Sequence, residues 1–346
     1  MDRTRVEAFL ERFNALGAGA TTVALLAVAD RSGLLGWLGS DGGGTAVEIA
    51  EGAGLDARYV TEVCSGLAAA GVLSHESGVF TLPEEHALLL ADESSPYFMG
   101  GWLDMIPAFY GQIDGVANAT RHGGGVGFTE YGPEVLRGLD RTNAPSQRIL
   151  LARKWLPAVP GLVGRLEEGV RVADVGCGSG TAAITMARAF PASTVIGFDT
   201  SPEAIEMAER RAEGLDNVSF EVRSIEAIPT DPGFDLITTF DVIHDLVDPL
   251  GGLIRIRSAL AEGGQYLMME PNMSSDLDDN LDDIGAMMYG TSAMFCMTQS
   301  LAAGGAGLGA AWGRQKAEQL AAEAGFTSFT TLESITNRFS AFYLLT

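Results

Sequence analysis

The stretch VADVGCGSG, residues Val172 to Gly180, constrains the fold of this chain more than any other segment. An apolar run ends in Asp174, and glycines follow at positions 176, 178 and 180. This pattern predicts a strand, a turn in which no side chain blocks a ligand, and a helix whose N-terminus faces that ligand. A second apolar run ends in Asp199, where a carboxylate can accept hydrogen bonds from both hydroxyls of a ribose. Together these features predict a nucleoside site on a Rossmann-type sheet.

The glycine spacing separates two kinds of nucleoside cofactor. Dinucleotide folds usually carry G-x-G-x-x-G, which admits a pyrophosphate, whereas this chain reads G-x-G-x-G. A glycine-rich turn in an unrelated α/β protein is the alternative interpretation of the loop taken alone.

Downstream of Val170, apolar runs alternate with helical segments. They predict strands at 171–175, 194–198, 218–223, 234–239 and 265–270. A further helix is expected to end over residues 260–264.

The N-terminal part of the chain has a different pattern. Residues 1 to 90 predict short helices followed by a hairpin that turns near Ser77 and Gly78, and residues 45–73 read as helix, turn and helix. This pattern resembles a winged-helix domain. The segment holds five basic and twelve acidic side chains, and the whole chain has a net charge of −23. Because contacts to bases and phosphates need donors and cations, we expect dimerisation or a substrate lid rather than nucleic-acid binding.

Composition excludes several other classes of protein. The longest apolar run, Val23 to Ala29, is much shorter than a membrane span, and no charged segment followed by an apolar core opens the chain. The three cysteines, Cys64, Cys177 and Cys296, show no C-x-x-C spacing, so neither a disulfide framework nor a zinc site is expected. A cytoplasmic protein with no membrane partner is the simplest expectation.

A helical, aromatic-rich connector is expected between the two patterns. It covers residues 91–168 and is interrupted by the glycine-rich stretch 121–127. Most of its rings are expected to pack between helices, but Trp102, Phe128 and Tyr131 are candidates for a substrate pocket. The predicted organisation is therefore a winged-helix domain over 1–90, a connector over 91–168 and a cofactor-binding domain over 169–346.

The downstream motifs resemble the class I S-adenosylmethionine-dependent methyltransferases. In order along the chain they are GFDTSP at 197–202, FEVRSIEAIP at 220–229, FDLITTFDVIHDL at 234–246 and LAEGGQYLMMEPN at 260–272. The resemblance implies an α/β fold with a seven-stranded Rossmann-like domain behind an N-terminal α-helical winged-helix domain, and S-adenosylmethionine as the cofactor. The cofactor-binding residues that it implies are Asp174, Gly176, Cys177, Gly178, Asp199, Thr200, Ser224, Ile225, Phe240 and Asp241. Ser224 stands where the family often has an aspartate over the adenine.

The expected chemistry centres on His244. Methyl transfer is an in-line displacement, so the protein supplies positioning and, for a weakly acidic acceptor, a base; imidazole titrates near neutrality. The chain resembles winged-helix small-molecule O-methyltransferases, whose catalytic histidine lies in a similar His-Asp pair, here His244 and Asp245. Two alternatives remain open: a loop histidine bonded to the backbone, and one that only positions the substrate.

A closer resemblance covers nearly the whole chain. Actinobacterial winged-helix methyltransferases, including C-methyltransferases of α-keto acids, share the stretches found here as IHDLVDP at 243–249 and SLAAGGAGLGAAWG at 300–313. No strand precedes the glycines at 304–309, so a tight connection between helices near the pocket is expected. In the keto-acid enzymes a second histidine and one like His244 hold a metal, whereas this chain has Phe295 in that segment. No metal is therefore expected.

The remaining expectations concern the substrate. Met288, Tyr289 and Phe295 predict an apolar pocket that tolerates aromatic groups, and the acidic run 274–283 is expected to be a solvated loop. The sequence thus predicts a homodimeric methyltransferase acting on a small aromatic or enolisable metabolite, by O- or C-methylation. Two alternatives use the same fold: a regulator that binds a ligand without catalysis, and an enzyme that uses the cofactor's charge for a rearrangement or decarboxylation.

Overall fold

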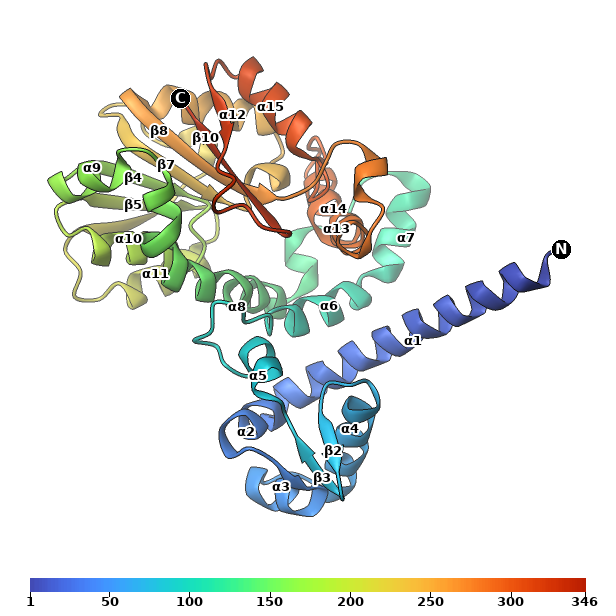
Figure 1. The fold of residues 1–346 in the computed structure, drawn as a ribbon. Coiled ribbons are helices and arrows are strands. Elements are labelled where there is room, and N and C mark those ends of the chain that lie inside the picture. Colours follow the sequence, from blue (N-terminus) through green and yellow to red (C-terminus); the bar gives the residue numbers. More distant parts are fainter. The chain divides into compact units, whose positions relative to one another are not determined.

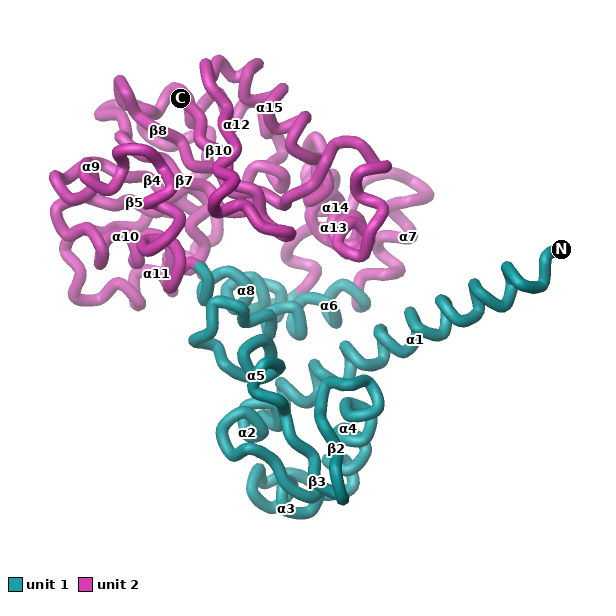
Figure 2. The backbone as a smooth tube through the Cα atoms, in the orientation of Figure 1, with its two compact units in different colours: residues 1–110, 132–146 teal, residues 111–131, 147–346 magenta.

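The computed structural model describes residues 1–346, which divide into two compact units (Figure 2). Unit 1 comprises residues 1–110 and 132–146, and unit 2 comprises residues 111–131 and 147–346. The connector expected over 91–168 is thus shared between the two units.

Unit 1 contains a winged helix-turn-helix. Its elements are the helices α1 Arg3–Arg31, α2 Leu34–Asp41, α3 Ala46–Ala53, α4 Ala57–Ala69 and α5 Glu84–Leu90, with the strands β1 Gly44–Thr45, β2 Ser74–Glu76 and β3 Val79–Thr81 (Figure 1). The strands form a sheet in the order β1-β3-β2. The wing turns at Ser77 and Gly78, with φ values of 51° and 87°, as the sequence predicts. The expectation of only short helices is wrong for α1, which has 29 residues.

Local signals explain why the helix pair forms. The Thr45 side chain caps α3 by accepting a hydrogen bond from the Glu48 amide, and the Glu48 carboxylate accepts one from the Thr45 amide. These two bonds together form a complete capping box. Asp56 caps α4 by accepting from the amides of Arg58 and Tyr59. The faces of α3 and α4 that carry Ile49 and Leu67 are buried in a shared core. By length and composition alone, α1 is the one helix able to cross a membrane.

The former connector supplies α6 Trp102–Gly111, α7 Ile113–His122 and α8 Pro133–Leu150. A 3-10 turn, Phe128–Tyr131, lies between α7 and α8. The glycine-rich stretch after α7 is irregular, as expected, because Gly123 and Gly124 both adopt a φ of 78°.

Unit 2 is a doubly wound α/β domain. Its strands are β4 Arg171–Val175, β5 Thr194–Asp199, β6 Val218–Val222, β7 Phe234–Phe240, β8 Leu260–Pro271, β9 Phe329–Thr331 and β10 Ser340–Leu345. They form one sheet of seven strands in the order β6-β5-β4-β7-β8-β10-β9. The strands β4 to β8 pair in parallel, and β10 is antiparallel to β8. This confirms the predicted Rossmann-like architecture.

Helices cover both faces of this sheet. Residues of α9 Leu162–Glu168, α10 Thr181–Ala189 and α11 Pro202–Arg211 share a core with Val172, while residues of α12 Pro249–Ala259 and α15 Arg314–Glu323 share another with Ala173 (Figure 1). Adjacent residues of one strand thus enter opposite cores, which is why the strands read as continuous apolar runs.

One predicted boundary is wrong. Residues 260–264 were expected to end a helix, but α12 already ends at Ala259 and Leu260 pairs with Phe234 as the first residue of β8. Gly263, with a φ of 72°, lies where the register between β7 and β8 shifts, so this glycine bends a strand instead of ending a helix.

The segment after β8 returns to the sheet through helices. A 3-10 turn, Leu277–Asn280, is followed by α13 Asp283–Thr291, a π-helical turn Ser292–Cys296 and α14 Met297–Ala302. The acidic run contains that 3-10 turn, in which Asn280 is buried and bonds back to the backbone of Ser274.

Candidate functional site

The glycine loop after β4 has the open conformation that its sequence predicts. Gly176, Gly178 and Gly180 adopt φ values of 71°, 51° and 81°, which side chains disfavour. A Cβ atom on Gly176 would lie 2.5 Å from Val242, so this glycine permits close packing between two loops. A Cβ atom on Gly178 would meet nothing within 4 Å, so that position leaves open space for a ligand.

Asp199 is fixed at the end of β5, beside this loop. Its Oδ2 accepts a hydrogen bond of 2.8 Å from the Gly178 amide, and its Oδ1 accepts one of 2.9 Å from the Ser201 amide. The other two residues expected here lie in the same turns. Cys177 stands between Gly176 and Gly178, and Thr200 follows Asp199. Each carboxylate oxygen retains a lone pair, so the group can still accept from a diol.

Asp174 at the end of β4 has an unsatisfied acceptor. Its Oδ1 accepts from the Thr238 hydroxyl at 2.8 Å, but its Oδ2 is buried and has no hydrogen-bond partner. Burial raises the pKa of this carboxyl to about 7, although the bond from Thr238 lowers it. A buried acceptor without a donor is costly, and a bound ligand with a donor would relieve that cost.

The other expected cofactor residues end neighbouring strands or open neighbouring turns. Ser224 precedes a 3-10 turn at Ile225–Ala227, in which Ile225 is buried. Phe240 ends β7 with its ring 5.8 Å from that of Trp155. Asp241 follows with a φ of 57°, a strained value that clusters at functional sites. In parallel sheets the carboxyl ends of the strands form the ligand crevice.

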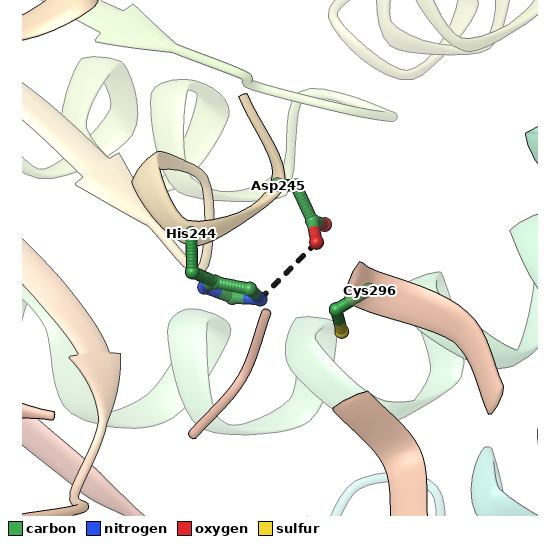
Figure 3. Close-up of side chains that lie close together, drawn as sticks. All are labelled: His244, Asp245 and Cys296. Carbon is green, nitrogen blue, oxygen red and sulfur yellow. Dashed lines mark ion pairs between the residues drawn. The ribbon is translucent and has the colours of Figure 1, made fainter. Parts of the chain in front are cut away.

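His244 is buried on a 3-10 turn, Ile243–Asp245, that follows β7. Its Nδ1 lies 2.6 Å from Oε2 of Glu270. On the other side of the ring, Nε2 lies 3.4 Å from Oδ1 of Asp245, the pair joined by the dashed line in Figure 3. The expected His-Asp pair is therefore present, but the shorter contact is to Glu270. This residue lies on β8, beside β7, and its Oε1 accepts from the Ile243 amide at 2.8 Å.

Sequence reasoning missed Glu270, although a signal was available. The strand reads YLMMEP, so a single carboxylate interrupts an apolar run just where the neighbouring strand leads into Asp241 and His244. Burial lowers the pKa of His244, but the carboxylates of Asp245 and Glu270 outweigh that effect and hold the pKa well above its ordinary value.

Cys296 joins this group from the π-helical turn. Its Sγ, an imidazole nitrogen of His244 and a carboxylate oxygen of Asp245 all lie within 4.8 Å of one another (Figure 3). A π-helical turn holds an extra residue and changes the direction of the side chains that follow. No spacing in the sequence indicates this contact.

Aromatic side chains gather around Phe295, the preceding residue. The Tyr131 ring packs edge-on at 5.1 Å and the Phe128 ring lies at 6.0 Å. The Tyr131 hydroxyl donates to the backbone oxygen of Met294. Three of the expected substrate residues are thus in contact with one another within unit 2.

The remaining expected substrate residues are less closely associated. Met288 is buried on α13, and the hydroxyl of the half-exposed Tyr289 accepts from Asn280. Trp102 belongs to unit 1.

The glycine-rich stretch 300–313 connects α14 to α15 and supports the histidine turn. The Gly309 amide donates to the His244 carbonyl at 3.1 Å, and the Ser300 hydroxyl donates to the Leu246 carbonyl at 3.0 Å. A Cβ atom on Gly309 would lie 2.0 Å from the Ser292 hydroxyl oxygen. The glycines therefore permit close backbone approach, as the expected tight connection requires.

Two family models match the chain. Residues 166–325 match a methyltransferase domain, and residues 20–92 match the Rv2258c-like winged helix-turn-helix domain.

Curated proteins match over part of their length. A 37.1 kDa protein of transposon TN4556 from Streptomyces fradiae is 38% identical over 109 residues, which are 31% of this chain and 32% of that protein. A ubiquinone/menaquinone biosynthesis C-methyltransferase of Geotalea uraniireducens (strain Rf4) is 30% identical over 155 residues, which are 41% of this chain and 65% of the relative. The chain therefore spans less than two thirds of either relative.

Solved structures match over nearly the whole chain. The mitomycin 7-O-methyltransferase MmcR superposes with a TM-score of 0.75 at 18% identity, covering 99% of both chains. Human N-acetylserotonin methyltransferase, solved in complex with S-adenosylmethionine, superposes with a TM-score of 0.70 at 19% identity, covering 97% of this chain and 96% of that one. At these identities the likeness establishes a shared fold.

Proposed function

We propose that this chain, which carries a methyltransferase domain of the class I S-adenosylmethionine fold behind an Rv2258c-like winged helix-turn-helix domain, transfers a methyl group to a small-molecule acceptor. The observation that carries the proposal is the arrangement of Asp199 and the glycine loop at the ends of β4 and β5. There the Asp199 carboxylate is held by two backbone amides beside the open position at Gly178. When bound, S-adenosylmethionine supplies an electrophilic methyl group on a sulfonium.

The residues present fit this cofactor. Asp199 would accept from the ribose hydroxyls, and Ser224 and Ile225 would flank the adenine. The unsatisfied Oδ2 of Asp174 offers an acceptor for the amino acid end of the cofactor. The other residues that would line the cofactor are Gly176, Cys177, Gly178, Thr200, Phe240 and Asp241.

On the acceptor side, His244 orients the substrate or takes its proton. Glu270 at 2.6 Å holds the Nδ1 side of the ring, so Nε2, which lies 3.4 Å from Asp245, is the nitrogen that would act on an acceptor hydroxyl or enol. The rings of Phe128, Tyr131 and Phe295 support an aromatic or enolisable acceptor, because flat apolar groups pack well against them. An enzyme that binds the cofactor without transferring methyl is the second candidate, and only product analysis separates the two.

We also propose that the protein is a homodimer that pairs through α1. One stripe of this helix, Val6, Phe9, Leu10, Phe13 and Leu16, has exposed fractions between 50% and 65%. The spacing places these side chains on a single helix face. The charges around the stripe are of both signs, from Arg5, Glu7, Glu11 and Arg12, which suits a second copy better than an anionic lipid surface or a nucleic acid.

Calorimetry with S-adenosylhomocysteine tests cofactor binding. We expect micromolar binding to the wild type and a loss of about tenfold or more in Asp199→Ala, because two charged hydrogen-bond acceptors are removed. Asp216→Ala, at an exposed aspartate of the same unit, should bind as the wild type does. Absence of heat with the wild type would refute the proposal. Transfer of labelled methyl to a metabolite extract would then separate transfer from binding alone.

A further inference from the structure

We propose that His244, Asp245 and Cys296 form a binding site for a zinc-type divalent cation. The three side chains offer one nitrogen, one oxygen and one sulfur atom within 4.8 Å of one another, with His244 and Cys296 buried (Figure 3). Imidazole and thiolate are the donors that zinc and its neighbours prefer, whereas magnesium and calcium prefer oxygen. The sequence predicted no metal because Phe295 replaces a histidine, but the next residue, Cys296, brings a donor into the same space.

The orientation of the imidazole supports this assignment. Glu270 accepts from Nδ1 at 2.6 Å, so Nε2, which lies near Asp245 and Cys296, is the nitrogen left to bind a cation. Histidines that ligate metals usually donate their other nitrogen to a carboxylate or carbonyl in this way. The same Glu270 also accepts from the backbone of the His244 turn, which fixes the ring and the turn together.

The contact between His244 and Asp245 is itself unsatisfied. In the neutral imidazole that a metal ion binds, with its proton on Nδ1, both Nε2 and the Asp245 Oδ1 that lies 3.4 Å away are acceptors. That oxygen is buried and has no hydrogen-bond partner. A cation between Nε2 and this oxygen would give each of them a partner.

The surroundings are preformed and acidic. The turn with His244 and the segment after Cys296 are joined by hydrogen bonds from the Gly309 amide and from the Ser300 hydroxyl. The carboxylate of Glu270 adds negative charge close to the imidazole, which favours a cation. Three protein ligands leave a coordination position open, as in catalytic zinc sites, where an acceptor oxygen could bind.

This inference goes beyond methyl transfer and can fail independently of it. If the ion binds, His244 acts on the acceptor as a ligand of that ion. If it does not bind, His244 retains the direct role proposed above. The test therefore measures metal binding in the absence of any methyl acceptor.

Cobalt titration of the chelator-treated full-length protein is the decisive experiment. We expect one equivalent of Co²⁺ to produce a thiolate-to-cobalt charge-transfer band together with visible bands of four- or five-coordinate cobalt, and Zn²⁺ to abolish them. Cys296→Ser should lose the charge-transfer band. Cys64→Ser, which alters a buried cysteine of unit 1, should keep it.

A second variant covers the case in which Cys296→Ser does not fold. Asp245 is partly exposed, so Asp245→Asn should fold and should weaken cobalt binding by more than about tenfold. A wild type without the charge-transfer band, or a band that survives in folded Cys296→Ser, would overturn the proposal. So would wild-type affinity in Asp245→Asn.

Discussion

At the scale of single residues, Glu270 organises the centre of the candidate site. Its Oε1 accepts from the amides of Val242 and Ile243, at 3.3 and 2.8 Å, and its Oε2 contacts His244. One buried carboxylate thus satisfies a backbone turn and orients an imidazole. Because all of these partners are buried or half-buried, the loss of the acceptor leaves them without water to replace it.

We therefore expect Glu270→Ala to lower the free energy of unfolding by about 1–3 kcal/mol, since the partners lose their acceptor. Glu270→Gln should cost less, because the amide oxygen can still accept. Urea unfolding of chelator-treated protein measures both. Glu226→Ala, at an exposed glutamate of the same unit, is the control and should change stability by less than about 0.5 kcal/mol. Equal stability of Glu270→Ala and this control would contradict the role assigned to Glu270.

At the scale of elements, three helices of unit 1 are joined by charges rather than by apolar packing alone. The fully buried Asp104 of α6 pairs with Arg137 and Arg141 of α8, and Arg141 also contacts Asp30 near the end of α1 at 2.8 Å. The Arg141 guanidinium lies 5.3 Å from the centre of the Phe98 ring. Such a network is strongly destabilised when one partner is removed, because the other charge stays buried.

Asp104→Asn should lower stability by about 3–5 kcal/mol at neutral pH. Burial raises the pKa of Asp104, but the hydrogen bonds and charges of Arg137 and Arg141 outweigh it and hold the pKa below 3.8. A carboxyl with a depressed folded-state pKa stabilises the fold above its unfolded pKa, and this contribution is lost as the pH falls through the folded value. The difference between wild type and variant should therefore shrink below about pH 4.

Thermal unfolding from pH 7 to pH 3 measures this dependence. Glu62→Gln is the matched control, because the Arg58–Glu62 pair is exposed on α4 and is worth less than about 1 kcal/mol. A variant that melts with the wild type at neutral pH would show that the network does not stabilise the three helices.

At the scale of the whole molecule, the exposed stripe on α1 is the basis of the proposed homodimer. An apolar helix face without a partner is unfavourable in water, and pairing with the same face of a second copy would bury it. The chain as described leaves that face open.

Multi-angle light scattering should therefore find a dimer for the wild type and a monomer for the double variant Phe9→Glu, Phe13→Glu, in which two carboxylates enter the paired face. Tyr59→Glu on α4 is the control, since Tyr59 is 75% exposed and lies outside the stripe. A monomeric wild type that cosediments with lipid vesicles would assign the stripe to a membrane surface instead.

Much of the fold could be predicted because it is encoded by neighbouring residues. The alternation of apolar runs and helices predicted β4 to β7 within about a residue, and the Ser77–Gly78 turn predicted the wing. The start of β8 was misjudged because Gly263 and Gly264 read equally well as a helix end or as a strand bend. The short β9 and the final β10 were not predicted, since their pairing with β8 joins segments far apart in the chain.

The sequence by itself determined the domain types, the parallel sheet and the conformation of the glycine loop, because each follows from local periodicity and from turns that only glycine adopts easily. Only the tertiary structure decided what surrounds His244. Glu270 lies 26 residues further along the chain and reaches the imidazole through the register of β7 against β8. Cys296 reaches it through a π-helical turn that redirects its side chain. Neither contact leaves a spacing in the sequence, because each depends on how distant segments pack.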